Sequence, residues 1–94
     1  MYKLSNEKKK ELMNILAENL PVFRAKLAIT QTDLASMIGV TKNTLTQIEN
    51  KKREMTWVTF VALVLLFHNI EKTKPLIDTF NLYPEELRRL FLAN

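Results

Sequence analysis

The stretch that decides the fold is Thr30-Gln31-Thr32-Asp33-Leu34-Ala35-Ser36-Met37-Ile38-Gly39-Val40-Thr41-Lys42-Asn43-Thr44-Leu45-Thr46-Gln47-Ile48-Glu49-Asn50. Thr30 followed by Asp33 is typical of a helix start, because the two side chains can cap each other's backbone N–H groups. Gly39, the only glycine of the chain, stands where a helix end favours positive φ. Thr41 can cap a second helix that runs to Glu49. The stretch therefore predicts two short helices joined by a turn of about three residues.

Such a pair of helices, with glycine in the turn, is a helix-turn-helix arrangement, in which the second helix enters the major groove of DNA. The apolar residues of the pair follow helical spacing and mark its inward face: Leu34, Ala35, Ile38, Leu45 and Ile48. The polar residues Lys42, Asn43, Thr46 and Gln47 lie on the other face of the second helix. A simple solvated helix face is the alternative interpretation of these polar residues.

The composition extends the helical prediction to the whole chain. The 94 residues include one Gly and three Pro, and 47% are hydrophobic. Sheets need many turns, and turns usually recruit Gly and Pro. A chain of this length corresponds to roughly one small domain. We therefore expect an all-α single domain over residues 1–94.

Several kinds of site are excluded by residue counts. The chain has no Cys, one Gly and one His. It therefore lacks thiolate and paired-His metal motifs, as well as the glycines of phosphate-binding loops. We expect no metal, no cofactor and no enzymatic activity. The longest apolar run, residues 57–67, is about half the length that a membrane helix needs, so we expect a buried helix and no membrane partner. The N-terminus lacks the apolar stretch of a secretory signal, and together with the absence of Cys this predicts a cytoplasmic protein.

Further helices flank the central pair on both sides. Residues 5–28 show helical periodicity, but Pro21 cannot donate to the carbonyl of Ala17, so we expect two segments, 6–19 and 20–28, with Asn19 as the cap of the second. Helices are also expected from Thr56 to Phe67 or Asn69, from Thr73 past Pro75, and after Pro84. This organisation predicts an N-terminal helical extension at 1–19, a helix-turn-helix core at 20–69 and C-terminal helices at 70–94.

Positive charge is concentrated in the middle of the chain. The net charge of the whole chain is +4, and residues 24–53 alone carry six Lys or Arg against two acids. Such a segment is typical of polyanion binding, although a solvated face would have the same charge. Lys8, Lys9 and Lys10 are interpreted as a solvated face of the first helix rather than as a DNA-binding arm.

Residues 20–64 resemble the Xre/Cro-repressor family of helix-turn-helix transcription regulators, which has the lambda-repressor-like fold. The residues that carry the resemblance are Leu20, Arg24, Leu27, Thr30-Gln31, Leu34-Ala35, Ile38-Gly39-Val40, Leu45 and Ile48-Glu49-Asn50. The sequence departs from the family pattern after Asn50, where the family usually has Gly-Lys and this chain has Lys51-Lys52.

The resemblance implies a set of DNA contacts. The positions that face bases match Lys42, Asn43, Thr44 and Gln47, and their chemistry suits this role, because Asn and Gln pair with adenine and Lys reaches guanine. Phosphate contacts are expected at the helix starts and in the following loop, from Gln31, Thr41, Asn50, Lys51, Lys52 and Arg53. In the family, an Arg and a Glu at the positions of Arg24 and Glu49 form an ion pair that braces the first helix against the recognition helix.

The apolar excess of the terminal helices indicates a homodimer, because an exposed apolar patch usually marks an interface. The side chains expected at the interface are Trp57, Phe80, Leu87, Leu90 and Phe91. The sequence as a whole predicts a sequence-specific regulator of bacterial or phage origin, most simply a repressor, that binds an inverted-repeat operator in double-stranded DNA. Two alternatives remain. One is the antitoxin of a toxin–antitoxin pair, with a toxin or co-regulator as protein partner, and the other is a protein-interaction module that does not bind DNA.

Overall fold

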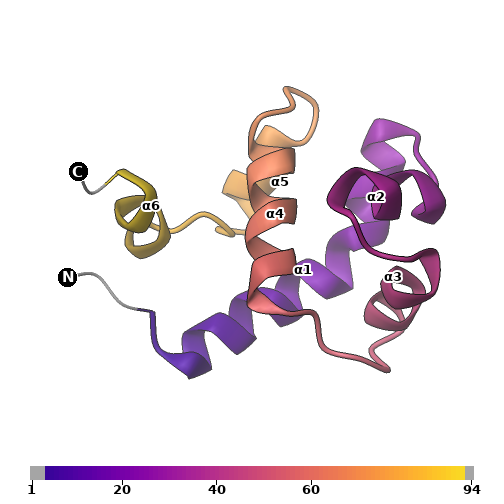
Figure 1. Ribbon diagram of the computed structural model, residues 1–94. Coiled ribbons are helices and arrows are strands. Elements are labelled where there is room, and N and C mark those ends of the chain that lie inside the picture. The colour runs from indigo at the N-terminus through magenta and orange to yellow at the C-terminus, as the bar shows by residue number, and fades with distance from the viewer. Residues whose placement is uncertain (1–3, 93–94) are drawn as a thin grey trace.

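The computed structural model describes residues 4–92, with side chains up to residue 90, and in this part of the chain helices are joined by loops, with no strand. Six helices follow one another: α1 (Asn6–Leu27), α2 (Gln31–Ile38), α3 (Lys42–Glu49), α4 (Trp57–His68), α5 (Lys74–Thr79) and α6 (Glu85–Leu92). In Figure 1, α1 crosses behind α4, α2 and α3 lie to one side of α4, and α6 lies to the other side. The all-α prediction is confirmed.

The first helix contradicts the prediction of a break at Pro21. Helix α1 is continuous through the proline, and Asn19 caps no second segment but donates its side-chain amide to the Ile15 carbonyl at 2.8 Å. Leu20 and Phe23, on either side of the proline, are fully buried. Burial of such side chains contributes about 1.5–3 kcal/mol each, which offsets the cost of about 3 kcal/mol for proline inside a helix. The expected limit between extension and core at residue 20 therefore falls inside α1.

Helix α4 is the centre of the core and packs against α1, α2 and α5. Its buried residues Phe60, Leu63, Val64 and Phe67 belong to one cluster that also includes Leu12 and Leu16 of α1. The rings of Phe23 and Phe67 are stacked with centroids 4.5 Å apart. The first turns of α1 are thus part of the same core as the helix-turn-helix.

Thr73, the only polar residue buried in the described part of the chain, forms a hydrogen bond to the C-terminal end of α4. Thr73 precedes α5 without capping it through its side chain. Its hydroxyl instead donates to the carbonyl of Phe67 at 2.8 Å. This bond satisfies one of the carbonyls that a helix end leaves without a partner.

Candidate nucleic-acid interface

The two helices of the central pair begin with side-chain caps. Thr30 and Asp33 form a complete capping box at the start of α2, and each side chain accepts the other residue's backbone N–H at 3.0 Å. These bonds hold the pKa of the Asp33 carboxyl below its ordinary value, because the Thr30 backbone N–H stabilises the charged form. Gly39 ends α2 with φ of 78°. The caps and the glycine stand where the sequence places them.

Helix α3 is held against the core by its apolar face. Leu45 is fully buried and Ile48 is 2% exposed, whereas Lys42 and Asn43 are exposed and Thr44 and Gln47 are half-buried. Thr41 caps the helix, with its hydroxyl oxygen accepting the Thr44 backbone N–H at 3.1 Å. The four residues expected to face bases therefore all keep some exposed surface.

A hydrogen-bonded network joins α3 to α1 and α2. The Arg24 guanidinium donates to both carboxylate oxygens of Glu49, each at 2.8 Å. The Glu49 side chain is only 5% exposed and that of Arg24 is 20% exposed. Hydrogen bonding to Glu49 raises the pKa of Arg24 above its ordinary value. The two residues expected as a brace are thus in direct contact, and Arg24 faces the interior of the motif.

Gln31 extends the same network. Its side-chain amide donates to Glu49 at 3.1 Å, and its carbonyl oxygen accepts the Thr46 hydroxyl at 2.7 Å. The structure thus uses the Gln31 side chain to join α2 to α3. The phosphate contact expected at the start of α2 stays a prediction. Thr46 was not among the expected site residues, and its position one turn before Asn50 gives no sign of this bond.

The loop after α3, residues 50–56, carries three of the basic residues of the central segment, Lys51, Lys52 and Arg53. Arg53 donates to the Thr44 hydroxyl at 3.4 Å, so an expected phosphate ligand and an expected base-reading residue lie together. Lys52 is exposed, as are Thr41 and Asn50. The expected phosphate contacts of Thr41, Asn50, Lys52 and Arg53, which directly precede or follow α3 in the chain, stay predictions.

Lys51 contacts the first helix of the chain. Its ammonium donates to the Asn14 side chain and lies 3.2 Å from the Glu18 carboxylate, both on α1. Its side chain is therefore turned toward α1, and its contact with phosphate stays a prediction. Its backbone φ of 62° lies in the left-handed region, which explains why the family pattern has glycine here. Asn14 and Glu18 stand four residues apart on one face of α1, and this spacing is the only signal the sequence gives of the contact.

The residues expected at a dimer interface differ in how far they are exposed. Leu87 is 1% exposed and packs inside the monomer, so it is not available to a partner. Leu90 is 44% exposed, whereas Trp57 and Phe80 are partly buried against the core. The side chain of Phe91 lies outside the described residues. Val58, which was not expected at the interface, is the most exposed of the large apolar residues, at 78%.

Comparison with known proteins agrees with this geometry. Residues 23–56 match the family model described as "Helix-turn-helix", and these residues span the end of α1, α2, α3 and the loop before α4. The match confirms the resemblance to the Xre/Cro-repressor helix-turn-helix regulators and supports DNA binding in transcription regulation. Searches of curated proteins and of solved structures give no significant match. None of the described helices is long and apolar enough to cross a membrane.

Proposed function

We propose that this chain is a sequence-specific repressor that binds an inverted-repeat operator as a homodimer. The observation that carries the proposal is the position of α3: its apolar side is anchored in the core, and its exposed side presents Lys42, Asn43 and Gln47. Lysine, asparagine and glutamine are side chains that read base edges in the major groove. Occupancy of a promoter by two such helices would block polymerase.

The loop supports the proposal with charge. Lys52 and Arg53 have no carboxylate partner in the part of the chain that the structure describes. Lysine and arginine side chains without a carboxylate partner, next to the helix that would enter the major groove, can contact DNA phosphates. Such contacts position the helix without reading the base sequence. Two such contacts in each subunit of a dimer neutralise about four phosphates, which gives a log–log salt slope of about −3.6.

A homodimer is proposed from the exposed apolar side chains. Val58 at the start of α4 and Leu90 in α6 are open to solvent, at 78% and 44%. Two copies related by a two-fold axis would place their recognition helices in successive major grooves, about 34–36 Å apart. The inverted repeat of the operator follows from this symmetry.

The experiment is a salt titration of binding to duplex DNA, using a site selected from a random pool. The wild-type chain should show a slope of about −3.6, and Lys52→Ala should reduce its magnitude by about 1.8, because a dimer loses two phosphate contacts. Binding that does not depend on salt, or a Lys52→Ala slope equal to that of the wild type, would refute the proposed phosphate contacts of the loop.

A further inference from the structure

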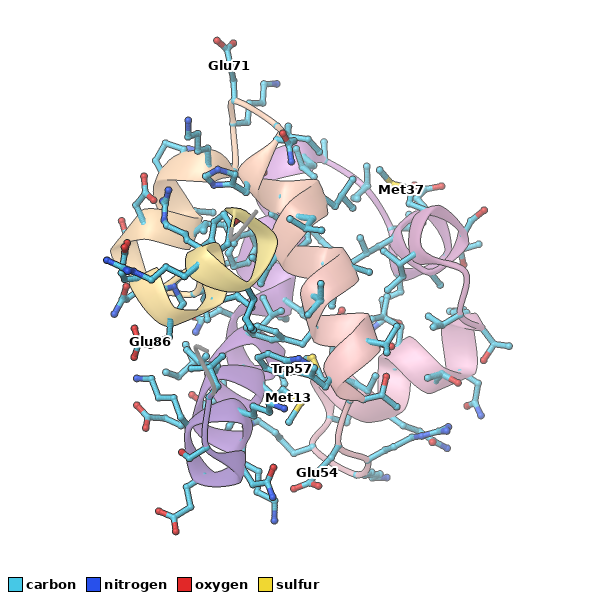
Figure 2. The ribbon with its side chains drawn as sticks, turned by 60° about the vertical axis from the view of Figure 1, so that its left-hand side comes forward. Met13, Met37, Glu54, Trp57, Glu71 and Glu86 are labelled. Carbon is cyan, nitrogen blue, oxygen red and sulfur yellow. The ribbon has the colours of Figure 1, made fainter. Side chains whose placement is uncertain are left out.

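A cleft of about 240 Å³ lies between α1 and the loop that follows α3. Its apolar part is formed by Met13 and Ala17 of α1 and by Met55, and its cations are Lys10, Lys51 and Arg53. In Figure 2, the labelled Met13 and Glu54 mark the two elements that line the cleft, α1 and the loop. Met13 and Lys10 precede the matched residues 23–56, so this cleft depends on the first turns of α1.

The charges of the cleft are not balanced. Glu54 is the only acid that lines it, and Lys51 is held by Asn14 and Glu18. Arg53 donates only to a threonine hydroxyl, and Lys10 has no ion pair or hydrogen bond within the described residues. A guanidinium and an ammonium without carboxylate partners, both lining one hollow, create a positive potential that attracts an anion.

The three consecutive lysines of α1 differ in their surroundings. Lys8 lies 3.7 Å from the Glu11 carboxylate, and the Lys9 ammonium lies 5.2 Å from the centre of the Trp57 ring. Lys10 alone of the three lines the cleft. The sequence favours a solvated face for all three, but the structure gives each lysine a different environment and separates Lys10 from the others.

We propose that this cleft binds a phosphate group, with Arg53 of the loop and Lys10 of α1 as its ligands. Arginine and lysine both form charge-assisted hydrogen bonds to phosphate oxygens. The phosphate belongs to one of two sources. It is either a DNA backbone phosphate that Lys10 contacts together with Arg53, in which case the inference rests on the proposed function, or a phosphate of a small molecule, which would then occupy Arg53 in competition with DNA.

The first arm of the test measures the affinity of Lys10→Ala for the selected duplex at a fixed salt concentration. Lys8→Ala is the matched control, since it removes a lysine of the same helix outside the cleft. If the backbone is the source, Lys10→Ala weakens duplex binding about tenfold or more, because the phosphate keeps Arg53 but loses a charge-assisted hydrogen bond in each subunit. Lys10→Arg restores the affinity, and Lys8→Ala leaves it unchanged.

The second arm measures the melting temperature with 5 mM sodium pyrophosphate against NaCl of the same ionic strength. If the source is a free ligand, pyrophosphate raises the melting temperature of the wild type and of Lys8→Ala, and Lys10→Ala loses this shift. Because this arm uses no DNA, it remains informative if the protein fails to bind duplex. The proposal is overturned if Lys10→Ala matches Lys8→Ala in both arms.

Discussion

The Glu49 side chain is 5% exposed, and its carboxylate accepts hydrogen bonds from two other helices, from Arg24 of α1 and from Gln31 of α2. A carboxylate with so little access to water is stable only while its partners stay in place. The network therefore does more than an ordinary surface ion pair: it fixes the end of the recognition helix relative to the two helices that support it. Stability measurements on single residues can test this.

Arg24→Ala should lower the free energy of unfolding by about 3–5 kcal/mol, because it leaves Glu49 buried without its main partner. Denaturant unfolding measures this loss. The double change Arg24→Ala with Glu49→Ala should cost less than the two single losses added together. Arg24→Ala should also leave the salt slope of DNA binding unchanged. A slope reduced while stability stays intact would instead make Arg24 a phosphate ligand.

Lys51→Gly should leave the chain as stable as the wild type or stabilise it by up to about 1 kcal/mol. A non-glycine residue in the left-handed region costs about 1 kcal/mol, and the exposed pair of Lys51 with Glu18 contributes at most a similar amount. Lys52→Gly is the control, because Lys52 is not among the residues with positive φ and glycine there should destabilise by about 0.4–1 kcal/mol. Equal losses for both variants would argue against the strain at Lys51.

At the scale of the elements, the beginning and end of each helix in the central pair are decided by local chemistry. The capping box of α2, the left-handed Gly39 and the cap of α3 by Thr41 involve residues at most four positions apart. Interactions of this range are the ones that a sequence shows most directly. The stability of α2 should accordingly depend on pH through Asp33.

The pKa of Asp33 is lower in the folded chain than its ordinary value of 3.8. A lowered folded pKa contributes stability that is complete above the unfolded pKa and is lost as the pH falls through the folded pKa. Asp33→Asn should therefore destabilise the chain at pH 7, and its difference from the wild type should shrink below pH 4. Denaturant midpoints from pH 7 to pH 2 measure this. A difference that does not change with pH would exclude the carboxylate as its source.

The elements and contacts that the sequence did not predict depend on long-range packing. The continuity of α1 through Pro21 is decided by core residues from several helices around Leu20 and Phe23, which no local rule for proline includes. Lys51 meets Asn14 and Glu18 more than thirty positions away, and Gln31 meets Thr46 fifteen positions away. The pair of Arg24 with Glu49 was expected only because the resemblance to a family implies it.

At the scale of the whole molecule, one core joins the helix-turn-helix to the helices on either side of it. Leu12 of α1, Leu34 of α2 and Leu87 of α6 belong to the same buried cluster. The apolar excess of the terminal helices is therefore largely used inside the monomer. What remains for a partner is a small number of exposed side chains, with Val58 foremost.

Val58→Asp should weaken the proposed dimer without lowering the stability of the monomer, because the side chain is 78% exposed. Sedimentation equilibrium over a range of concentrations measures the dissociation constant. Val22→Asp is a matched control, since Val22 is also an exposed valine on a helix, at 46%. Equal dissociation constants for both variants and the wild type would place the interface elsewhere, and a wild-type monomer at tens of micromolar would contradict the dimer.

The central claim is that the exposed face of α3 reads bases, and the most direct measurement is the affinity of Gln47→Ala for the selected site and for all its single-base variants. The account predicts a loss of about 1–3 kcal/mol on the selected site, with discrimination relaxed at one base pair in each half-site. Lys52→Ala, measured in parallel, should weaken all sites alike. A Gln47→Ala protein that keeps the wild-type affinity and the wild-type ranking of all variants would contradict the account.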